Sequence, residues 1–404
     1  MFLRTKYFYF LRGTLSSHVH FYKGWVDAAR EHGLPINMVT VLPDSVYAEQ
    51  IDLVEKFSRY DYFHILRYKK TETKQRLINL FFGWYLLLHK KVIVQLKKQD
   101  INQFDTLKKI FKDRLKCIIE LEGDAEAEKE YLVQHAYKEK FYDQTIRSMD
   151  KGIARLPQTL KKADHIFVLS DFFKETLCGR YPELSLREKI STLSTGVDCG
   201  RNYYSPRLRT CARRELNIET KFAMTFIGNV FYSWQNISRT IEIFSLIKRT
   251  VAENAYLILL VPDNDHSIAQ EFLNKYDVKA GDYLLKQVDY DQIAYYLNAA
   301  DIGFLLRSKH TMNQAASPGK FGDYTACGLP VIMTEKISDF SDMISQTEFC
   351  AVLDDMDDDD EVIRKIKPFL MHDDTRRQEL SQWAVKHVSI QSRINIYIQT
   401  LKSL

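Results

Sequence analysis

The sequence predicts an α/β protein with two domains, each built on a parallel sheet that helices cover on both faces. The chain has 404 residues, which is too long for one ordinary core and suits two domains of about 150 to 200 residues each. Apolar runs of strand length alternate with segments of helical spacing, and this alternation is typical of parallel sheets. We place the first domain at residues 1–200, a polar and basic linker at 201–217 and the second domain at 218–384.

The composition is that of a globular protein and argues against several classes. Hydrophobic residues make up 45% of the chain, and the formal net charge of +4 is small for this length, so nucleic acid is not an expected partner. The six cysteines lie far apart without paired spacing, which argues against a zinc site and a disulfide framework. The first residues lack the apolar core of a signal peptide, and no run reaches the roughly 20 apolar residues of a membrane span. We therefore expect a cytoplasmic protein without a metal centre.

In the first domain, strands are expected where apolar residues cluster, with helices between them. These strands are expected at residues 6–11, 37–42, 62–66, 92–96, 115–121, 163–170 and 190–193. Ligands of parallel sheets bind beyond the carboxyl ends of the strands. This rule singles out the loop at Gly13 and the segment that follows Leu121. His18 lies at the start of the helix after Gly13, where it is either part of a site or a simple helix residue.

Two carboxylates follow the strand that ends at Leu121. Glu122 and Asp124 stand before a helix that we expect from about residue 125 to 149. Two carboxylates held together raise the pKa of one of them and so provide a proton donor or acceptor. The alternative is an acidic first turn of a helix, which the helix dipole favours. Both interpretations stay open from the sequence.

Residues 76–91 form a basic and aromatic stretch with an apolar centre. It contains Trp84 and Tyr85, has cations at both ends and is too short to span a bilayer. A helix of this kind can lie on an anionic membrane. Because the stretch leads straight into the strand expected at 92–96, the alternative is a helix that packs in the core.

The second domain begins with an apolar strand at 222–227, and a loop with Gly228 and Asn229 follows. Further strands are expected at 256–261, from 283, at 302–306 and at 331–334, with helices between them. Arg307 ends one of these strands, and its planar guanidinium can hold two phosphate oxygens at once. The alternative for Arg307 is a solvated loop residue.

The stretch from Ser317 to Thr334 organises this domain, because loop, helix and strand follow one another in it without a gap. Free amides at the helix start, the close backbone approach at Gly319 and the ammonium of Lys320 all favour a bound phosphate. Asp323, on the first turn, can accept hydrogen bonds from sugar hydroxyls. The alternative is an ordinary helix end before a buried strand.

This stretch resembles the donor-binding motif of retaining family-4 glycosyltransferases of the GT-B fold. The resemblance implies two Rossmann-like domains that face each other across a cleft, and a C-terminal helix, here at residues 385–404, that crosses back to the first domain. It implies transfer of a hexose from a nucleotide-diphosphate sugar to an acceptor hydroxyl with retention of configuration, without a cofactor or a metal ion. Ala315 stands where the family has the first of two glutamates, and Asp323 takes the place of the second.

The resemblance also assigns roles to individual positions. The residues that would bind the donor are Gly228, Asn229, Val288, Ser317, Gly319, Lys320, Phe321 and Asp323. Arg307 and Lys320 would stabilise the departing diphosphate. Glu122 or Asp124 would lie near the reacting sugar carbon.

Relatives of this kind commonly build surface polysaccharides, which implies a saccharide or lipid-linked acceptor and a place at the inner face of the cell membrane. The acceptor would bind on the side of Gly13 and His18. Two other functions stay open. One is a GT-B sugar epimerase, which would release an altered free sugar without an acceptor. The other is a catalytically silent relative that binds a nucleotide sugar or a partner glycosyltransferase, which Ala315 and Asn229 favour.

Overall fold

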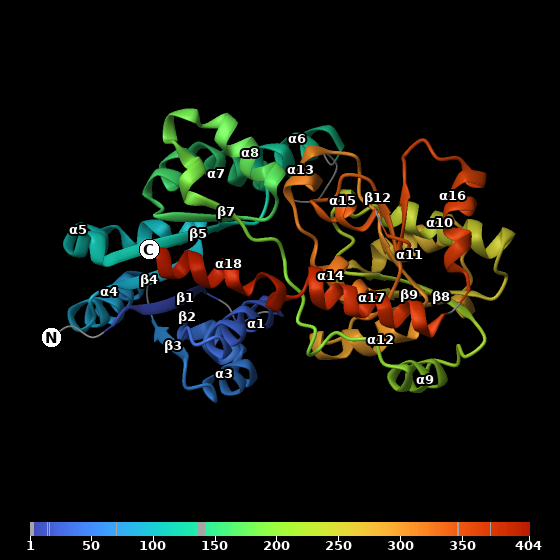
Figure 1. Cartoon of the computed structure of the whole chain (residues 1–404), viewed down its shortest axis with the longest axis horizontal. Helices are drawn as coiled ribbons and strands as arrows, with labels where there is room; N and C mark the ends of the chain where they lie inside the picture. Colours follow the sequence, from blue (N-terminus) through green and yellow to red (C-terminus); the bar gives the residue numbers. More distant parts are fainter. Residues whose placement is uncertain are drawn as a thin grey trace. The chain divides into compact units, whose positions relative to one another are not determined.

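Two parallel sheets, one in each of two units of the chain, form the framework of the structure (Figure 1). The computed structural model describes residues 4–404 except 14, 16, 70, 136–141, 346 and 372. Unit 1 contains Met1–Lys129, Phe141–Ser194 and Arg393–Leu404, and unit 2 contains Glu130–Lys140 and Thr195–Ser392. The α/β class with two Rossmann-like sheets, predicted from the sequence, is confirmed.

Unit 1 has seven parallel strands in the order β3-β2-β1-β4-β5-β6-β7. The strands are β1 (Lys6–Arg12), β2 (Ile36–Pro43), β3 (Phe63–Tyr68), β4 (Val92–Lys97), β5 (Leu115–Leu121), β6 (His165–Val168) and β7 (Ile190–Thr192). The helices are α1 (Ser17–Glu31), α2 (Asp44–Glu49), α3 (Ile51–Ser58), α4 (Thr71–Leu88), α5 (Asp105–Phe111), α6 (Ala125–His135), which begins in this unit, α7 (Tyr142–Lys162), α8 (Asp171–Arg180) and most of α18 (Ile390–Ser403).

The first strand shows how the sequence builds a sheet with helices on both faces. In β1, Phe8 and Phe10 point to one face, where their ring centroids lie 5.3 and 6.1 Å from that of Phe82 in α4. Tyr9 points to the other face, and its ring centroid lies 4.8 Å from that of Tyr22 in α1. Successive side chains of a strand point to opposite sides, so an unbroken apolar run is expected of a strand buried on both faces.

Unit 2 has six parallel strands in the order β10-β9-β8-β11-β12-β13. The strands are β8 (Phe222–Ile227), β9 (Ala255–Leu260), β10 (Tyr283–Lys286), β11 (Ile302–Leu305), β12 (Val331–Thr334) and β13 (Cys350–Leu353). The helices are α9 (Pro206–Glu215), α10 (Ile237–Thr250), α11 (His266–Lys275), α12 (Ile293–Ala299), α13 (Thr311–Ala315), α14 (Gly319–Ala326), α15 (Phe340–Ser345), α16 (Asp359–Ile366) and α17 (Asp374–His387).

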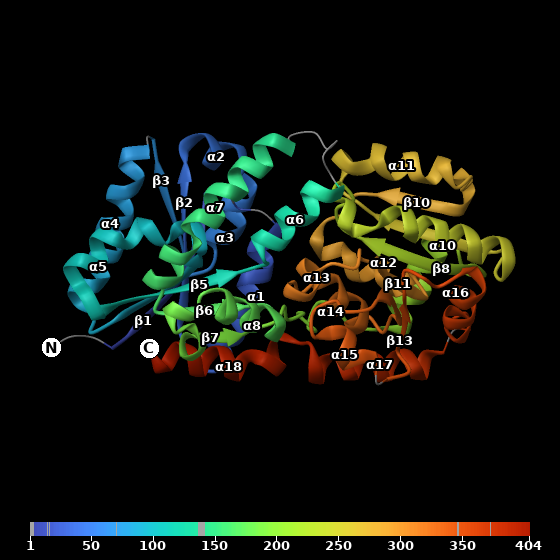
Figure 2. The ribbon, with the colours of Figure 1, turned by 90° about the horizontal axis from the view of Figure 1, so that it is seen from above.

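Buried side chains form a cluster on each face of the sheet of unit 2. Helices α10 and α11 contribute Phe244 and Leu273 to one cluster. Helices α12, α14 and α17 contribute Leu297, Tyr324 and Leu380 to the other. Figure 1 shows α10 and α12 on opposite sides of β8 and β9, and Figure 2 turns the same ribbon by 90°.

The strand order reverses at one point in each sheet. β1 pairs with both β2 and β4, and β8 pairs with both β9 and β11, so the chain builds one half of each sheet first and the other half afterwards. Ligands of such sheets bind beyond the carboxyl ends of the two strands at the reversal. In unit 2 these ends lead to Gly228, after β8, and to Arg307, shortly after β11.

Two segments differ from the expectation. Residues 201–217, expected as a linker, contain α9 and belong to unit 2. Two of their basic side chains, Arg209 and Arg213, are buried and contact the carboxylate of Asp301 at 2.5 and 3.2 Å. The helix expected at 385–404 is divided between the end of α17 and α18.

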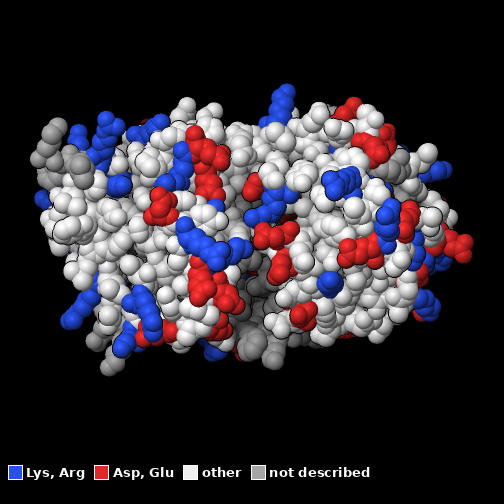
Figure 3. All heavy atoms as spheres, turned by 90° about the horizontal axis from the view of Figure 1, so that it is seen from below, with Lys and Arg blue, Asp and Glu red and all other residues white. Residues whose placement is uncertain are grey.

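The length of the helices and the distribution of surface charge bear on contacts with a membrane or with nucleic acid. None of the described helices is long and apolar enough to cross a membrane. Basic and acidic side chains lie next to one another on the face drawn in Figure 3, in keeping with the small formal net charge of +4.

Candidate functional site

Tyr324 fixes helix α14 at the point where the strand order of unit 2 reverses. β8 and β11 pair at Ile302 and Gly303 of β11. Further along, the Tyr324 hydroxyl accepts a hydrogen bond from Ile227 N of β8 at 3.0 Å and donates one to Phe304 O of β11 at 3.2 Å. A Cβ added at Gly303 would lie 2.7 Å from the Tyr324 ring, so this ring needs the glycine below it. Helix α14 is thereby attached to both strands.

The loop before α14 is anchored to the segment at Thr195. Thr195 N donates to Ser317 Oγ at 2.9 Å, and Thr195 Oγ1 donates to Ser317 O at 2.6 Å. Gly322 lets α14 approach Val197, because an added Cβ would lie 2.8 Å from the Val197 Cβ. The first amides of a helix have no carbonyl partner within the helix and attract anions. Gly319, the first residue of α14, is exposed, so this helix start is open to a ligand.

Lys320 reaches from the start of α14 to the end of β8. Its Nζ lies 4.0 Å from the centroid of the Phe226 ring and donates a hydrogen bond to Gln235 Oε1 at 3.0 Å. A Cβ added at Gly228 would lie 3.6 Å from this Nζ, and the φ of +111° at Gly228 favours glycine. The ammonium therefore lies among a ring, an amide and the backbone, and no ion pair joins it to a carboxylate in the described part of the chain.

Arg307 brings a second cation to the same edge of the sheet. Its backbone N–H and C=O both bond to Thr334 Oγ1 of β12, at 3.0 Å each. The side chain is buried, and its Nε has no hydrogen-bond partner among the described residues. Burial lowers the pKa of Arg307 to about 10, and burial together with the charge of Arg307 lowers the pKa of Lys320 well below its ordinary value. Two neighbouring cations of this kind are expected where an anion binds.

Asp323 lies one turn after the start of α14 and is paired with an amide from a distant part of unit 2. Asn202 Nδ2 donates to Asp323 Oδ1 at 2.7 Å. Burial raises the pKa of Asp323 to about 7, although Arg201 and Asn202 act in the opposite direction. Asn202 is itself buried, and its Oδ1 has no hydrogen-bond partner among the described residues. The carboxylate and this amide oxygen together offer acceptors for neighbouring hydroxyls of one ligand.

The other residues that were expected to bind the sugar donor differ in how deeply they are buried. Asn229 is exposed, and Val288, shortly after β10, is partly buried. Phe321 is fully buried, and its ring is stacked on that of Phe340 with the centroids 4.4 Å apart. The side chain of Phe321 therefore belongs to the core, which leaves its backbone for any contact with a ligand.

The two carboxylates after β5 are bound to different cations. Asp124 is buried and accepts hydrogen bonds from both terminal nitrogens of Arg180, at 2.9 and 2.7 Å. Its Oδ1 also accepts from Glu126 N at 3.1 Å, in the first turn of α6, as the helix-start interpretation expects. Glu122 is exposed and lies 3.0 Å from Lys97 Nζ. A catalytic role for either carboxylate stays a prediction. Asp124 is the weaker candidate, because Arg180 binds both of its oxygens.

Sequence reasoning missed Glu120, which stands inside β5. Tyr9 OH donates to Glu120 Oε2 at 2.6 Å, and Gln95 Nε2 donates to Glu120 Oε1. Tyr397 OH of α18 in turn donates to Gln95 Oε1 at 2.6 Å. Burial raises the pKa of Glu120 to about 7. The signal in the sequence was a glutamate within an otherwise apolar strand.

The expected acceptor-side residues are only partly described. Gly13 follows β1 with a φ of +72°, and Leu15 N donates to Gln50 Oε1 at 2.7 Å. The side chain of His18 lies outside the described part of the chain. Among the described residues, no cluster of three or more His, Cys, Asp or Glu is arranged to hold a metal ion.

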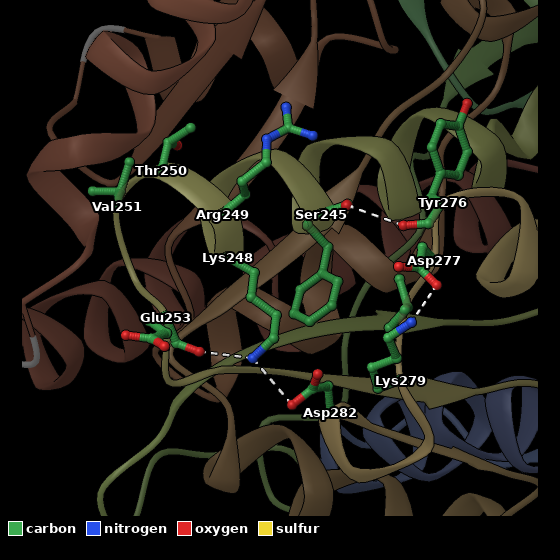
Figure 4. A pocket seen from close by; sticks show the side chains of 12 residues that line it. Ser245, Lys248, Arg249, Thr250, Val251, Glu253, Tyr276, Asp277, Lys279 and Asp282 are labelled. Carbon is green, nitrogen blue, oxygen red and sulfur yellow. Dashed lines mark hydrogen bonds and ion pairs between the residues drawn. The ribbon is translucent and has the colours of Figure 1, made fainter.

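A hollow of about 670 Å³ lies elsewhere in unit 2 (Figure 4). The ends of α10 and α11 and the segments before β9 and β10 line it, so it lies at the amino ends of these strands. Lys248 lies 3.0 Å from Asp282, and Lys279 is paired with Asp277. Its lysines are therefore neutralised within the protein, and the rule for parallel sheets places ligands at the opposite, carboxyl ends.

Residues 209–387 match the family model of the glycosyl transferases group 1. The match covers less than half of the chain and lies within unit 2, where it includes Arg307, Lys320 and Asp323. A search of curated protein sequences gave no significant match.

Solved structures of similar fold cover almost the whole chain. Sucrose-phosphate synthase from Thermosynechococcus elongatus is 12% identical, with a TM-score of 0.66 over 99% of this chain and 100% of that one. HepE from Anabaena, solved in complex with UDP, is 10% identical, with a TM-score of 0.65 over 98% and 100% of the two chains. A glycosyltransferase from Rickettsia africae is 14% identical, with a TM-score of 0.64 over 100% of both. These likenesses show the GT-B fold, and together with the family match they support a glycosyltransferase.

Proposed function

We propose that this protein is a glycosyltransferase that moves a hexose from a nucleotide-diphosphate sugar to an acceptor hydroxyl. The observation that carries the proposal is the pair of cations, Lys320 and Arg307, near the carboxyl ends of β8 and β11, with no ion pair to either of them in the described part of the chain. A diphosphate would supply the missing negative charge, and the start of α14 would supply N–H donors for its oxygens. HepE has been solved with UDP and with UDP-glucose, so UDP sugars are the first donors to test.

The nucleoside would lie on the other side of the cation pair. Asp323 offers a carboxylate, and Asn202 offers a buried amide oxygen that has no hydrogen-bond partner among the described residues; the two neighbouring hydroxyls of a ribose match them. The base would lie near Val288, after β10. In this arrangement Asn202 contributes to donor binding from outside the stretch that the sequence singled out.

The cation pair favours the transition state over the bound donor. Negative charge builds on the departing diphosphate while positive charge builds at the sugar carbon, and preorganised cations stabilise such a charge distribution. We propose that Lys320 and Arg307 provide this stabilisation without a metal ion. The proposal of retention rests on the resemblance of the stretch from Ser317 to Thr334 to retaining enzymes.

We propose a saccharide or lipid-linked acceptor and a role in surface polysaccharide synthesis at the inner face of the cell membrane. The resemblance to enzymes of that kind supports this part of the proposal. Unit 1 would bind the acceptor near Gly13 and His18, and Glu122, which is exposed, would be the candidate for proton transfer.

The test is release of nucleoside diphosphate from a panel of nucleotide sugars, with a panel of saccharide acceptors and a chelator present. The proposal expects acceptor-dependent release that Lys320→Ala reduces. The control Lys279→Ala should leave the release unchanged, because Lys279 lies at the amino ends of the strands, away from the proposed site, where it pairs with the exposed Asp277. The anomeric configuration of the first product, followed by NMR, tests retention. Release of an altered free sugar without an acceptor would indicate an epimerase instead.

A catalytically silent relative is the second candidate function. Ala315 is fully buried in α13 where the resembling family has a glutamate, and Asn229 offers an amide where that family has an arginine. Binding of a nucleotide sugar without release of its nucleoside diphosphate under any acceptor condition would favour this function over the transferase.

A further inference from the structure

Helix α4 has two apolar sides, and the fold uses one of them. Ile78, Phe82 and Leu86 are fully buried. Phe82 packs on Phe8 and Phe10 of β1, with ring centroids 5.3 and 6.1 Å apart. This side attaches α4 to the sheet of unit 1, as expected of a core helix.

The other side of α4 carries an exposed apolar stripe, which consists of Leu80, Trp84, Leu87 and Leu88. Their exposed fractions are 70%, 63%, 62% and 40%. Residues three and four apart are neighbours on a helix surface, so these side chains adjoin one another. Helix α5 lies beside α4 (Figure 2), and its Ile110 is 64% exposed. Single exposed apolar residues are common, whereas a contiguous stripe marks an interaction surface.

The charges around the apolar stripe are mainly basic. Arg76 lies one turn before the stripe and Lys90 follows the helix, and both are exposed. Residues 73–91 contain no aspartate or glutamate. Lys109 and Lys112, at the end of α5, are exposed as well, and the exposed Asp113 beside them is paired with Lys116. At the left end of the face drawn in Figure 3, where α4 and α5 lie, the surface is mainly uncharged with basic side chains at its margin.

We propose that the apolar stripe of α4 docks unit 1 on an anionic lipid surface. The helix would lie parallel to the membrane, with the stripe in the boundary between headgroups and acyl chains and with Arg76 and Lys90 at the level of the lipid phosphates. Tryptophan and leucine next to basic residues suit this boundary. Anionic headgroups complement the excess of basic charge around the stripe.

A second copy of the chain fits this surface less well. If two copies packed their stripes together, antiparallel helices would place Arg76 of one against Lys90 of the other, and parallel helices would place each cation against its own counterpart. Both arrangements bring like charges together, which opposes association. An anionic membrane provides the apolar and the negative partner at once. This inference does not depend on the glycosyltransferase reaction.

The test is flotation of the purified full chain with vesicles of phosphatidylcholine alone and of phosphatidylcholine mixed with phosphatidylglycerol. We expect the wild type to bind the mixed vesicles. The triple variant Leu80→Ser, Trp84→Ser, Leu87→Ser should have a bound-to-free ratio at least about tenfold lower, because it removes most of the apolar area of the stripe. The matched control carries Met356→Ser, Met371→Ser and Val385→Ser, which replace exposed apolar residues of unit 2. The control should bind as the wild type does.

Two further readouts test the orientation and the charge. Trp84 fluorescence should shift to shorter wavelength on the mixed vesicles, and Trp84→Phe should remove the shift while most of the binding persists. The double variant Arg76→Glu, Lys90→Glu should bind the mixed vesicles more weakly, and higher salt should weaken the wild type in the same way.

Several outcomes would overturn the inference. Equal flotation of wild type and a folded triple variant, shown by circular dichroism, would mean that the stripe does not dock on lipid. A wild-type dimer in light scattering that the triple variant abolishes, without flotation on either vesicle, would identify a second copy as the occupant.

Discussion

The charged side chains that the sequence assigned to a site are arranged differently in the two units. In unit 2, Lys320 and Arg307 lie close together at the carboxyl edge of the sheet with no ion pair to either in the described part of the chain. In unit 1, Asp124 is held by Arg180, and Glu122 is held by Lys97. A charge satisfied within the protein stabilises the fold, whereas a buried charge without a counter-charge gains from a ligand. The difference favours unit 2 as the donor site and favours a structural role for Asp124.

The largest effect is expected from removing one of the two cations of unit 2. Lys320→Ala or Arg307→Ala should lower turnover on the order of 10²-fold, because each removes a charged group that stabilises the departing diphosphate. Steady-state release of nucleoside diphosphate measures it, with Lys279→Ala as the control. Wild-type rates in both variants would remove the assignment of the site.

Replacing Arg180, the cation that pairs with Asp124 in unit 1, should lower the stability of the fold. In Arg180→Ala the buried carboxylate of Asp124 loses the two hydrogen bonds from Arg180 and keeps the one from Glu126 N. We expect the free energy of unfolding to fall by roughly 2 kcal/mol, less than for a fully buried pair because Arg180 is partly exposed. Urea unfolding measures this change. The control Arg187→Ala removes an exposed pair with Glu175 and should leave the stability nearly unchanged, because both groups are open to solvent. Equal stability of the two variants would contradict the structural role of Asp124.

A pH-dependent contribution is expected from Asp323. Its pKa is about 7 in the folded protein and near the ordinary 3.8 after unfolding, so the folded state binds the proton more tightly. Stability from this group is full below about pH 4 and is lost as the pH rises to about 7. Asp323→Asn lacks this contribution. We therefore expect the wild type to lose stability relative to the variant over that interval, by about 1 kcal/mol because the carboxylate is partly exposed.

Thermal unfolding of both proteins between pH 4 and pH 8 checks this prediction. Glu120 titrates in the same direction but is present in both proteins, so its contribution cancels in the difference. A difference that does not change with pH would show that Asp323 has an ordinary pKa.

The smallest effect is expected from Glu122→Gln. This carboxylate is 54% exposed and its ion pair with Lys97 is open to solvent, so stability should change by at most about 0.5 kcal/mol. If unit 1 contributes structure alone at this point, turnover should also remain unchanged. A marked loss of turnover would instead identify Glu122 as the acid or base of the reaction.

The sequence predicted those parts of the fold and of the candidate site that depend on local pattern. The strands β5 and β8 were placed at Leu115–Leu121 and Phe222–Ile227, as observed, because each is an apolar run with polar residues or a glycine at its end. Lys320 was placed at a helix start because a Pro-Gly loop precedes it and a buried strand follows the helix. Each of these predictions depends on a stretch of at most about twenty consecutive residues.

Contacts between distant residues were not predictable in this way. Asn202 and Asp323 are 121 residues apart, and the segment of Asn202 was expected to be a linker. Arg180 and Asp124 are 56 residues apart, so the pairing that distinguishes a structural from a catalytic carboxylate is set by tertiary structure. The polar and basic composition of residues 201–217 suggested a linker, although Arg209 and Arg213 of α9 are buried against carbonyls and a carboxylate.

The measurement that tests the account most directly is calorimetric titration of the purified protein with nucleoside diphosphates and nucleotide sugars, beginning with UDP and UDP-glucose. The account predicts selective binding of one nucleotide, weakened on the order of tenfold or more in Lys320→Ala and in Asn202→Ala, and unchanged in Lys279→Ala. No binding of any nucleotide, or binding that is equal in all of these variants, would contradict a donor site in unit 2.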